Sequence, residues 1–253
     1  MRHTERHGID DYELFLYKPD TMPPPEGFSV IYVLDGNAYF HTVADIVSLL
    51  NRSSDLSPYI VSLQARRYEK TGVVPAIVCA VGYPGDLPFH PRRFWDYTPK
   101  RDSLNMPTRP NGLPWPESGG AEDFLRTLEE VIKPFVEARY PVNRLEQTLF
   151  GHSLGGLFTV YALFAKPGAY QNYMAISPSL WWNRRLMQGL EQDFFSQSKI
   201  DAQRLFVAVG SEEKEHIRQD AEDLYARLQD SGKIRAAFIE APGENHISVV
   251  PTV

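Results

Sequence analysis

The sequence contains a single cysteine, Cys79, among 253 residues. One cysteine cannot form an internal disulfide, and its place in an apolar run favours a buried thiol in a reducing compartment. The chain has no run of about 18 apolar residues and no apolar segment behind a basic amino terminus. We therefore expect neither a membrane span nor a secretory signal, and we predict a cytoplasmic protein.

Positive charge is also scarce. The 26 lysine and arginine residues are outnumbered by 32 aspartate and glutamate residues, which gives a formal net charge of -6 at pH 7. This balance argues against general nucleic-acid binding, although it leaves room for a local basic pocket. The histidines lack metal-ligand spacing, so we expect no metal and no cofactor. The composition is that of a globular protein, and we predict one domain over residues 1–253.

The most informative stretch surrounds Ser153. The pattern Gly151-x-Ser153-x-Gly155 precedes an apolar helical run that continues to Ala165. It is typical of a sharp strand-to-helix turn, where glycines avoid collisions and the serine hydroxyl stands clear of the sheet. Unpaired N–H groups at the helix start, including that of Leu154, would face a developing oxyanion. We interpret Ser153 as a nucleophile; the alternative is a small-residue turn without chemistry.

Apolar runs and helical periodicity predict an open α/β sheet. Besides the strand before Ser153, the expected strands are 12–18, 28–34, 76–81, 173–176, 205–209 and 236–240, and the expected helices are 39–50, 58–69, 124–136 and the segment around 217–228. Ligands bind beyond the carboxyl ends of such strands. The turn Asp35-Gly36-Asn37 could thus supply a second oxyanion donor, or it could be a plain tight turn. Pro134 should kink its helix.

Candidates for the acid and the base follow two later strands. Gly210-Ser211-Glu212-Glu213 comes after the strand 205–209, where the acid of a hydrolase triad belongs, and we select Glu213. Acidic residues at a helix start are also simple dipole partners, which is our interpretation of Glu212 and Glu215. His246 follows both Ser153 and Glu213 and lies in a loop beyond the last strand. It is the natural general base.

The segment 83–120 is a long loop rich in proline, glycine, aromatic residues and arginine. Loops of this length more often have a function than merely connect elements. We therefore predict that this segment is an insertion that forms one wall of the substrate site, and we call it the substrate wall. Arg92, Arg93 and Tyr97 are its candidate binding residues, and the alternative is a solvated loop whose arginines pair with neighbours. Of the adjacent Trp181 and Trp182, one should lie in the core and one in the cleft; we select Trp182 for the cleft.

Six segments together carry a resemblance to a known family. They are Tyr32–Phe40 (YVLDGNAYF), Arg92–Pro99 (RRFWDYTP), Gly151–Gly156 (GHSLGG), Ser177–Trp182 (SPSLWW), Gly210–Glu213 (GSEE) and Gly243–His246 (GENH). The chain resembles the α/β-hydrolase esterases that include esterase D and, more closely, the ferric-siderophore esterases acting on enterobactin, salmochelin and bacillibactin. The resemblance implies Ser153 as nucleophile, His246 as base, Glu213 as acid and oxyanion donors at Asn37 and Leu154. It also implies that the arginines face an anionic substrate.

The expected fold is an α/β-hydrolase: a doubly wound, mostly parallel sheet with helices on both faces, a first strand that could be antiparallel, and no large separate cap. The expected function is that of a serine esterase that acts through an acyl-enzyme on a small-molecule ester, such as the ester backbone of a catecholate siderophore. The alternatives are a generic carboxylesterase or acyltransferase of the esterase D type, and a non-catalytic ligand-binding homologue. Neither nucleic acid nor membrane is an expected partner.

Overall fold

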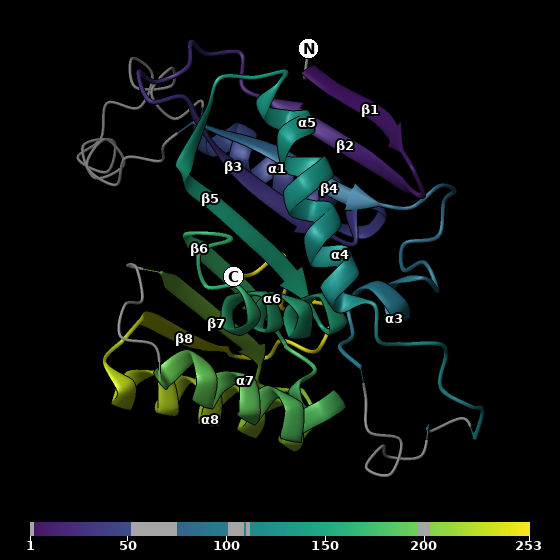
Figure 1. Ribbon diagram of the computed structural model, residues 1–253, viewed down its shortest axis with the longest axis vertical. Helices are drawn as coiled ribbons and strands as arrows, with labels where there is room; N and C mark the ends of the chain where they lie inside the picture. The colour runs from purple at the N-terminus through teal and green to yellow at the C-terminus, as the bar shows by residue number, and fades with distance from the viewer. Residues whose placement is uncertain (1–2, 52–74, 101–108, 110–111, 197–202) are drawn as a thin grey trace. The chain divides into compact units, whose positions relative to one another are not determined.

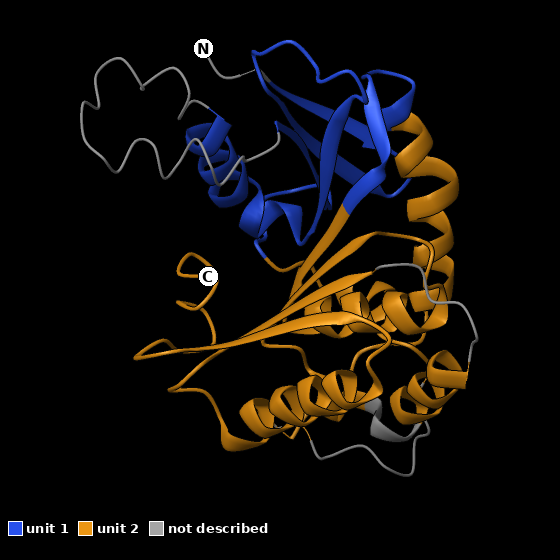
Figure 2. Ribbon diagram, turned by 90° about the vertical axis from the view of Figure 1, so that its left-hand side faces the viewer, with its two compact units in different colours: residues 1–88, 136–147 blue, residues 89–135, 148–253 orange. Residues whose placement is uncertain are grey.

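The computed structural model describes residues 3–51, 75–100, 109, 112–196 and 203–253. The chain divides into two compact units, one comprising residues 1–88 and 136–147 and the other residues 89–135 and 148–253 (Figure 2). The described strands follow the order β1-β2-β4-β3-β5-β6-β7-β8 in a mostly parallel sheet (Figure 1). Strand β5 (Val142–His152) begins in the first unit and ends in the second.

The first unit contains β1 (His3–Ile9), β2 (Tyr12–Lys18), β3 (Phe28–Leu34), β4 (Ala76–Gly82) and helix α1 (Gly36–Asn51). Strands β3 and β4 are parallel, whereas β2 pairs antiparallel with β4. All of β4 is buried, as its uninterrupted apolar sequence predicts. The predicted β2, β3, β4 and α1 are confirmed.

Strand β1 is an addition to the predicted elements. Its sequence, HTERHGI, lacks apolar alternation, yet it pairs along its whole length with β2, from His3 opposite Lys18 to Ile9 opposite Tyr12. It is an edge strand, and charged residues on such a strand discourage pairing with a second chain. Backbone hydrogen bonds to β2 therefore place this segment, and its side-chain pattern does not reveal it.

In the second unit, the end of β5 and the strands β6 (Asn172–Ile176), β7 (Arg204–Gly210) and β8 (Arg235–Ala241) are parallel. Helix α6 (Leu154–Ala165) packs against β6, and α8 (Glu215–Ser231) packs against β7 and β8. These elements are confirmed. Helix α7 (Arg184–Ser196), which packs on α6, and the short α3 (Arg93–Asp96) were not predicted. The predicted helix 58–69 lies outside the described residues.

The helix predicted around Pro134 is present but is not uniform. It runs through α4 (Ala121–Thr127), a π-helical turn (Leu128–Ile132) and α5 (Lys133–Glu137). Proline lacks the N–H of a helical bond, and its ring collides with the carbonyl four residues earlier. A wider π-helical turn just before Pro134 relieves that collision. Pro134 was expected to kink this helix, and the irregularity that the structure shows is a π-helical turn.

The parallel strands of the second unit all end at the same edge (Figure 1). Ser153 follows β5, Ser177 follows β6, Glu213 lies in the turn after β7, and His246 lies in the loop after β8. The register places His152 opposite Ile176 and Gly210 opposite Ala241, so these strand ends are neighbours. None of the helices in the described ranges combines the length and hydropathy needed to cross a bilayer.

Candidate active site

Ser153 occupies a strained backbone position between β5 and α6. Its φ is 58° and its ψ is −113°, a backbone conformation that residues other than glycine rarely adopt and that costs about 1–3 kcal/mol. The Ser153 N–H donates to the Ile176 carbonyl at 2.9 Å, and the Ser179 N–H donates to the Ser153 carbonyl at 3.1 Å. These bonds to the turn after β6 hold the serine in place.

Two glycines make the turn sterically feasible. A Cβ at Gly151 would overlap the Gly155 carbonyl oxygen, and one at Gly156 would lie 2.9 Å from the Ile176 carbonyl oxygen. Only residues without a side chain allow the chain to reverse so tightly and α6 to approach β6 so closely. Gly151 and Gly156 are therefore explained by two close backbone approaches, one to the Gly155 carbonyl and one to the Ile176 carbonyl.

Glu213 and His246 form a hydrogen-bonded pair. The distance from His246 Nδ1 to Glu213 Oε2 is 2.6 Å; the Glu213 side chain is fully buried, and that of His246 is 36% exposed. A carboxylate accepts, so Nδ1 carries the proton and the neutral ring keeps the Nε2 lone pair free to take one. Glu212 and Glu215 are exposed. The geometry therefore favours Glu213 over its two neighbours as the acid.

The Glu213 carboxylate is stabilised in its charged form. Burial raises its pKa, but the hydrogen bonds from His246, from the Gly210 N–H at 3.0 Å and from the Ser177 hydroxyl outweigh burial and lower it. Ser177 is completely buried and has a φ of 47°. Because both carboxylate oxygens accept hydrogen bonds, the carboxylate is held at a fixed angle to the imidazole.

The Ser153 hydroxyl lies beside a second serine. Its Oγ is 3.4 Å from Ser179 Oγ, and within the described ranges no hydrogen bond joins Ser153 to His246. The structure thus brings His246 and Glu213 into contact and leaves the hydroxyl of Ser153 turned toward Ser179. Catalytic hydrogen bonds of this kind are often loose before substrate binds.

His152 connects the turn of Ser153 to the loop of His246. Its side chain is buried, its Nε2 lies 2.6 Å from the His246 carbonyl oxygen, and the two imidazole centroids are 4.6 Å apart. Burial, with smaller contributions from His246 and Arg93, lowers the pKa of His152 to about 3. His152 is therefore neutral near neutral pH.

Acid should destabilise the folded protein through His152. Its pKa is about 3 when folded and about 6.5 when unfolded, so between these values only the unfolded chain binds the proton. The contribution of His152 to the free energy of unfolding is therefore complete above the pKa of the unfolded state. Below that pKa the free energy of unfolding falls by up to about 1.4 kcal/mol per pH unit. Urea denaturation of His152→Gln should show a flatter decline of the unfolding free energy between about pH 6.5 and pH 4. A slope equal to that of the unchanged protein would contradict this assignment.

The predicted oxyanion donors belong to different units. The Leu154 N–H lies in the first turn of α6 and that of Asn37 in the first turn of α1, where no helical carbonyl reaches them. The Asn37 side chain bridges to the loop after β4: Nδ2 donates to the carbonyls of Tyr83 and Gly85, and Oδ1 accepts from the Tyr83 N–H at 2.8 Å. These bonds fix the turn that presents the Asn37 backbone. The oxyanion roles of Leu154 and Asn37 stay predictions.

The two arginines of the predicted substrate wall differ in exposure. The Arg92 side chain is 37% exposed and its Nε is 3.3 Å from Asp96 Oδ2, whereas Arg93 is buried and lies over the rings of Phe89 and Tyr97. The positive charge of Arg93 also acts on His152. Arg93 therefore contributes positive potential at the elbow, and Arg92 is the more accessible of the two.

Tyr97 and Trp182 are fully or almost fully buried, at 0% and 1% exposure. Tyr97 packs against Phe124 and Phe158, and Trp182 packs edge-on against Trp115. Both side chains lie in the core, which corrects the expectation that they line a substrate surface. The adjacent tryptophans do divide between core and surface, but the partly exposed one is Trp181.

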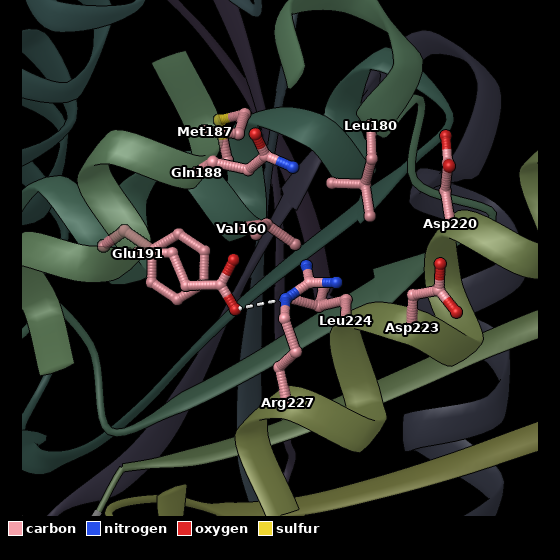
Figure 3. A pocket seen from close by; sticks show the side chains of 10 residues that line it. Val160, Leu180, Met187, Gln188, Glu191, Asp220, Asp223, Leu224 and Arg227 are labelled. Carbon is pink, nitrogen blue, oxygen red and sulfur yellow. Dashed lines mark hydrogen bonds and ion pairs between the residues drawn. The ribbon is translucent and has the colours of Figure 1, made fainter. Parts of the chain in front are cut away.

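Among the described residues, the second unit contains a cavity and a larger hollow. A cavity of about 140 Å³ lies between α6, α7 and α8 (Figure 3), with the Glu191–Arg227 ion pair in its wall. No proposed catalytic residue lines it. A larger hollow of about 600 Å³ is formed by segment 83–120 itself, lined by Trp95, Lys100, Trp115, Pro116, Glu117 and Ser118. Its volume is in the range of small-molecule sites, at about 300–1,000 Å³.

Comparison with known proteins identifies the family. The model of the family described as "Putative esterase" matches residues 96–251. The chain belongs to this esterase family. The esterase is 41% identical to the ferri-bacillibactin esterase BesA of Bacillus subtilis, over 99% of this chain and 84% of that protein. It is 37% identical to the siderophore enterobactin esterase of Emericella nidulans, over 82% of this chain and 66% of that protein.

A solved structure supports the same assignment. The BES protein from Bacillus cereus superposes on the esterase with a TM-score of 0.85 at 39% identity, covering 100% of this chain and 93% of that one. The esterase therefore has the α/β-hydrolase fold, as predicted.

Three residues of the site were not predicted from the sequence. Ser177, Ser179 and His152 contact, respectively, the Glu213 carboxylate, the Ser153 hydroxyl and the His246 carbonyl. The sequence signals for the two serines were their place after the predicted strand 173–176 and their membership of the segment Ser177–Trp182, without a role for either. His152 joins the elbow of the esterase to its His246 loop by a hydrogen bond.

Proposed function

We propose that this esterase hydrolyses its substrate through a serine acyl-enzyme. The observation that carries the proposal is the His246–Glu213 pair, joined at 2.6 Å, at the strand edge where Ser153 occupies its strained turn. His246 Nε2 takes the proton of the Ser153 hydroxyl as Oγ attacks the ester carbonyl carbon. For this step the Ser153 hydroxyl rotates from Ser179 toward His246.

The remaining steps use the same groups. The tetrahedral oxyanion accepts hydrogen bonds from the Leu154 N–H and, in our proposal, from that of Asn37. Collapse of this intermediate breaks the ester bond, and the alcohol leaves with the proton that His246 held. Water then attacks the acyl carbon while His246 takes its proton. The bond between that carbon and Ser153 Oγ breaks, Oγ receives the proton from His246, and a carboxylic acid leaves as the product. Glu213 stabilises the imidazolium throughout.

We propose that the ester is the backbone of an anionic catecholate siderophore. The relatives are esterases of ferri-bacillibactin and enterobactin by name. On this chain, a protein with a net charge of -6 carries Arg92 and Arg93 together at the start of α3, and the positive charge of Arg93 acts on His152. The 600 Å³ hollow offers the indole rings of Trp95 and Trp115 to flat rings and Lys100 to an anion.

Hydrolysis of an ester panel tests both parts of the proposal. The panel contains a tricatechol trilactone with and without bound iron, a neutral trilactone lacking catechols, and a small neutral ester. We expect the tricatechol substrates to have the highest kcat/KM, with no turnover by Ser153→Ala. Equal kcat/KM across the panel would indicate a generic esterase. Turnover only when an alcohol acceptor is supplied would indicate an acyltransferase.

Removal of the arginines should weaken binding of anionic substrates alone. For the double variant Arg92→Ala and Arg93→Ala, we expect KM for an anionic catechol ester to rise at least about tenfold, or roughly 1.4 kcal/mol. The KM for a small neutral ester should hardly change, and the difference should shrink at high salt because ions screen the charges. Arg126→Ala, in the exposed ion pair with Asp123, is the matched control. Equal losses on both substrates would mean that the arginines only hold the loop.

A further inference from the structure

His152 links the turn of the proposed nucleophile to the loop of the proposed base. It is bonded covalently to Ser153, and its side chain reaches the backbone of His246, 94 residues later in the chain. The side chain is 1% exposed, which leaves it almost no surface for contact with a substrate. Any part that His152 plays in the reaction must therefore pass through another residue.

The direction of the His152 bond follows from its acceptor. A backbone carbonyl can only accept, so the proton of the neutral ring is on Nε2 and is donated to the His246 oxygen at 2.6 Å. Burial, His246 and Arg93 all favour the neutral form of this imidazole, and together they outweigh Glu213 and the bond to the His246 carbonyl, which favour the charged form. A single donor at a defined atom thus holds the carbonyl of the base.

Other contacts hold the rest of the His246 loop. The Gly243 N–H donates to Ser211 Oγ at 2.8 Å, and the Glu244 carbonyl accepts from the Glu212 N–H at 2.9 Å. Beyond the base, the Ser248 N–H donates to Asn245 Oδ1 at 3.1 Å. These contacts fix both sides of the loop, and the His152 bond acts on the peptide that follows the Cα of His246.

The position of that peptide decides where the imidazole points. Its carbonyl direction sets ψ of His246 and with it the direction of the Cα–Cβ bond, while Glu213 sets the rotation of the ring through Nδ1. The imidazole therefore has a backbone anchor and a ring anchor. Both are needed because Nε2 must come within about 3 Å of Ser153 Oγ, and an error of about 1 Å can cost 100-fold in rate.

We propose that His152 is a positioning residue, which holds the backbone of His246 so that the imidazole reaches Ser153. The inference rests on the proposed function, because it presupposes that Ser153 and His246 react with the substrate. The inference goes beyond the proposed function because it gives a role to the residue before the proposed nucleophile: His152 joins the elbow to the loop of the proposed base by a hydrogen bond.

Three substitutions of His152 test the proposal. Glutamine can place an amide N–H close to the position of Nε2, whereas asparagine is one methylene too short, and phenylalanine keeps the ring without a donor. We expect His152→Gln to retain kcat within about threefold. His152→Asn and His152→Phe should lower kcat by about 10- to 100-fold, with KM changed less than about twofold. His216→Gln, on the exposed surface of α8, is the matched control.

The glutamine–asparagine comparison separates positioning from packing. Both variants remove the imidazole and should lose stability in thermal melts, so a packing role alone would lower kcat equally in the two. Equal kcat in both, or full kcat in His152→Phe, would overturn the inference. Ser153→Ala and His246→Ala are measured alongside. If those two keep their activity, the proposed function fails, whereas their inactivity together with a fully active His152→Asn defeats only the inference on His152.

Discussion

Ser153→Ala should lower kcat by a factor of at least about 10³. In the proposed mechanism the triad works as a unit: without the hydroxyl, His246 has no proton to take and no acyl-enzyme forms. Alanine also lacks the group that a fluorophosphonate modifies. We expect stoichiometric labelling of the unchanged protein at Ser153 and none of the variant, measured by intact-protein and peptide mass spectrometry.

Ser179→Ala is the control for this substitution. Its hydroxyl lies 3.4 Å from that of Ser153, so it removes an equivalent group from the same place without removing the proposed nucleophile. We expect Ser179→Ala to remain labelled at Ser153 and to retain kcat within about tenfold. A folded, unmodified protein that escapes labelling would instead favour a non-catalytic binding role. Labelling at Ser179 would move the nucleophile to the turn after β6.

The sequence predicts two kinds of element well: strands that are buried on both faces, and turns in which the backbone comes too close for any residue but glycine. Strand β4 is an unbroken apolar run and is wholly buried, so composition alone identifies it. The elbow is identified by glycines that no other residue can replace, since a Cβ at Gly151 overlaps the Gly155 carbonyl. Strand β1 shows the reverse case: backbone pairing with β2 places a polar segment that has no apolar pattern.

The candidate site likewise contains residues that local sequence identifies and residues that only long-range contacts identify. Ser153, Glu213 and His246 could be selected because each follows a predicted strand and their order is informative. Ser177 and His152 could not, because their contacts join residues 36 and 94 positions apart. The choice between Trp181 and Trp182 failed for a similar reason. Alternation predicts that adjacent side chains diverge, but which one meets Trp115 depends on how distant segments pack.

His246→Ala should be nearly as damaging as Ser153→Ala, and Glu213→Gln should be milder but still large. Removal of the base leaves the Ser153 proton with no acceptor, so kcat should again fall by about 10³ or more. Glutamine at position 213 keeps the shape but loses the charge that stabilises the imidazolium. Its amide also presents an N–H where the carboxylate accepted bonds from Ser177, Gly210 or His246. The wrong ring tautomer becomes favourable as a result.

Glu212→Gln and Glu215→Gln are matched controls, since each makes the same chemical change on an exposed neighbour within the same turn or the start of α8. We expect both to retain kcat within about twofold, because exposed charges at a helix start contribute only about 0.3–1 kcal/mol and only to stability. Steady-state kinetics on one ester at constant pH compares all four variants. Full activity of Glu213→Gln beside a large loss in Glu215→Gln would transfer the role of the acid to α8. Full activity in every glutamine variant would leave Ser153 and His246 as a dyad, with Glu213 serving only to hold the imidazole in the folded protein.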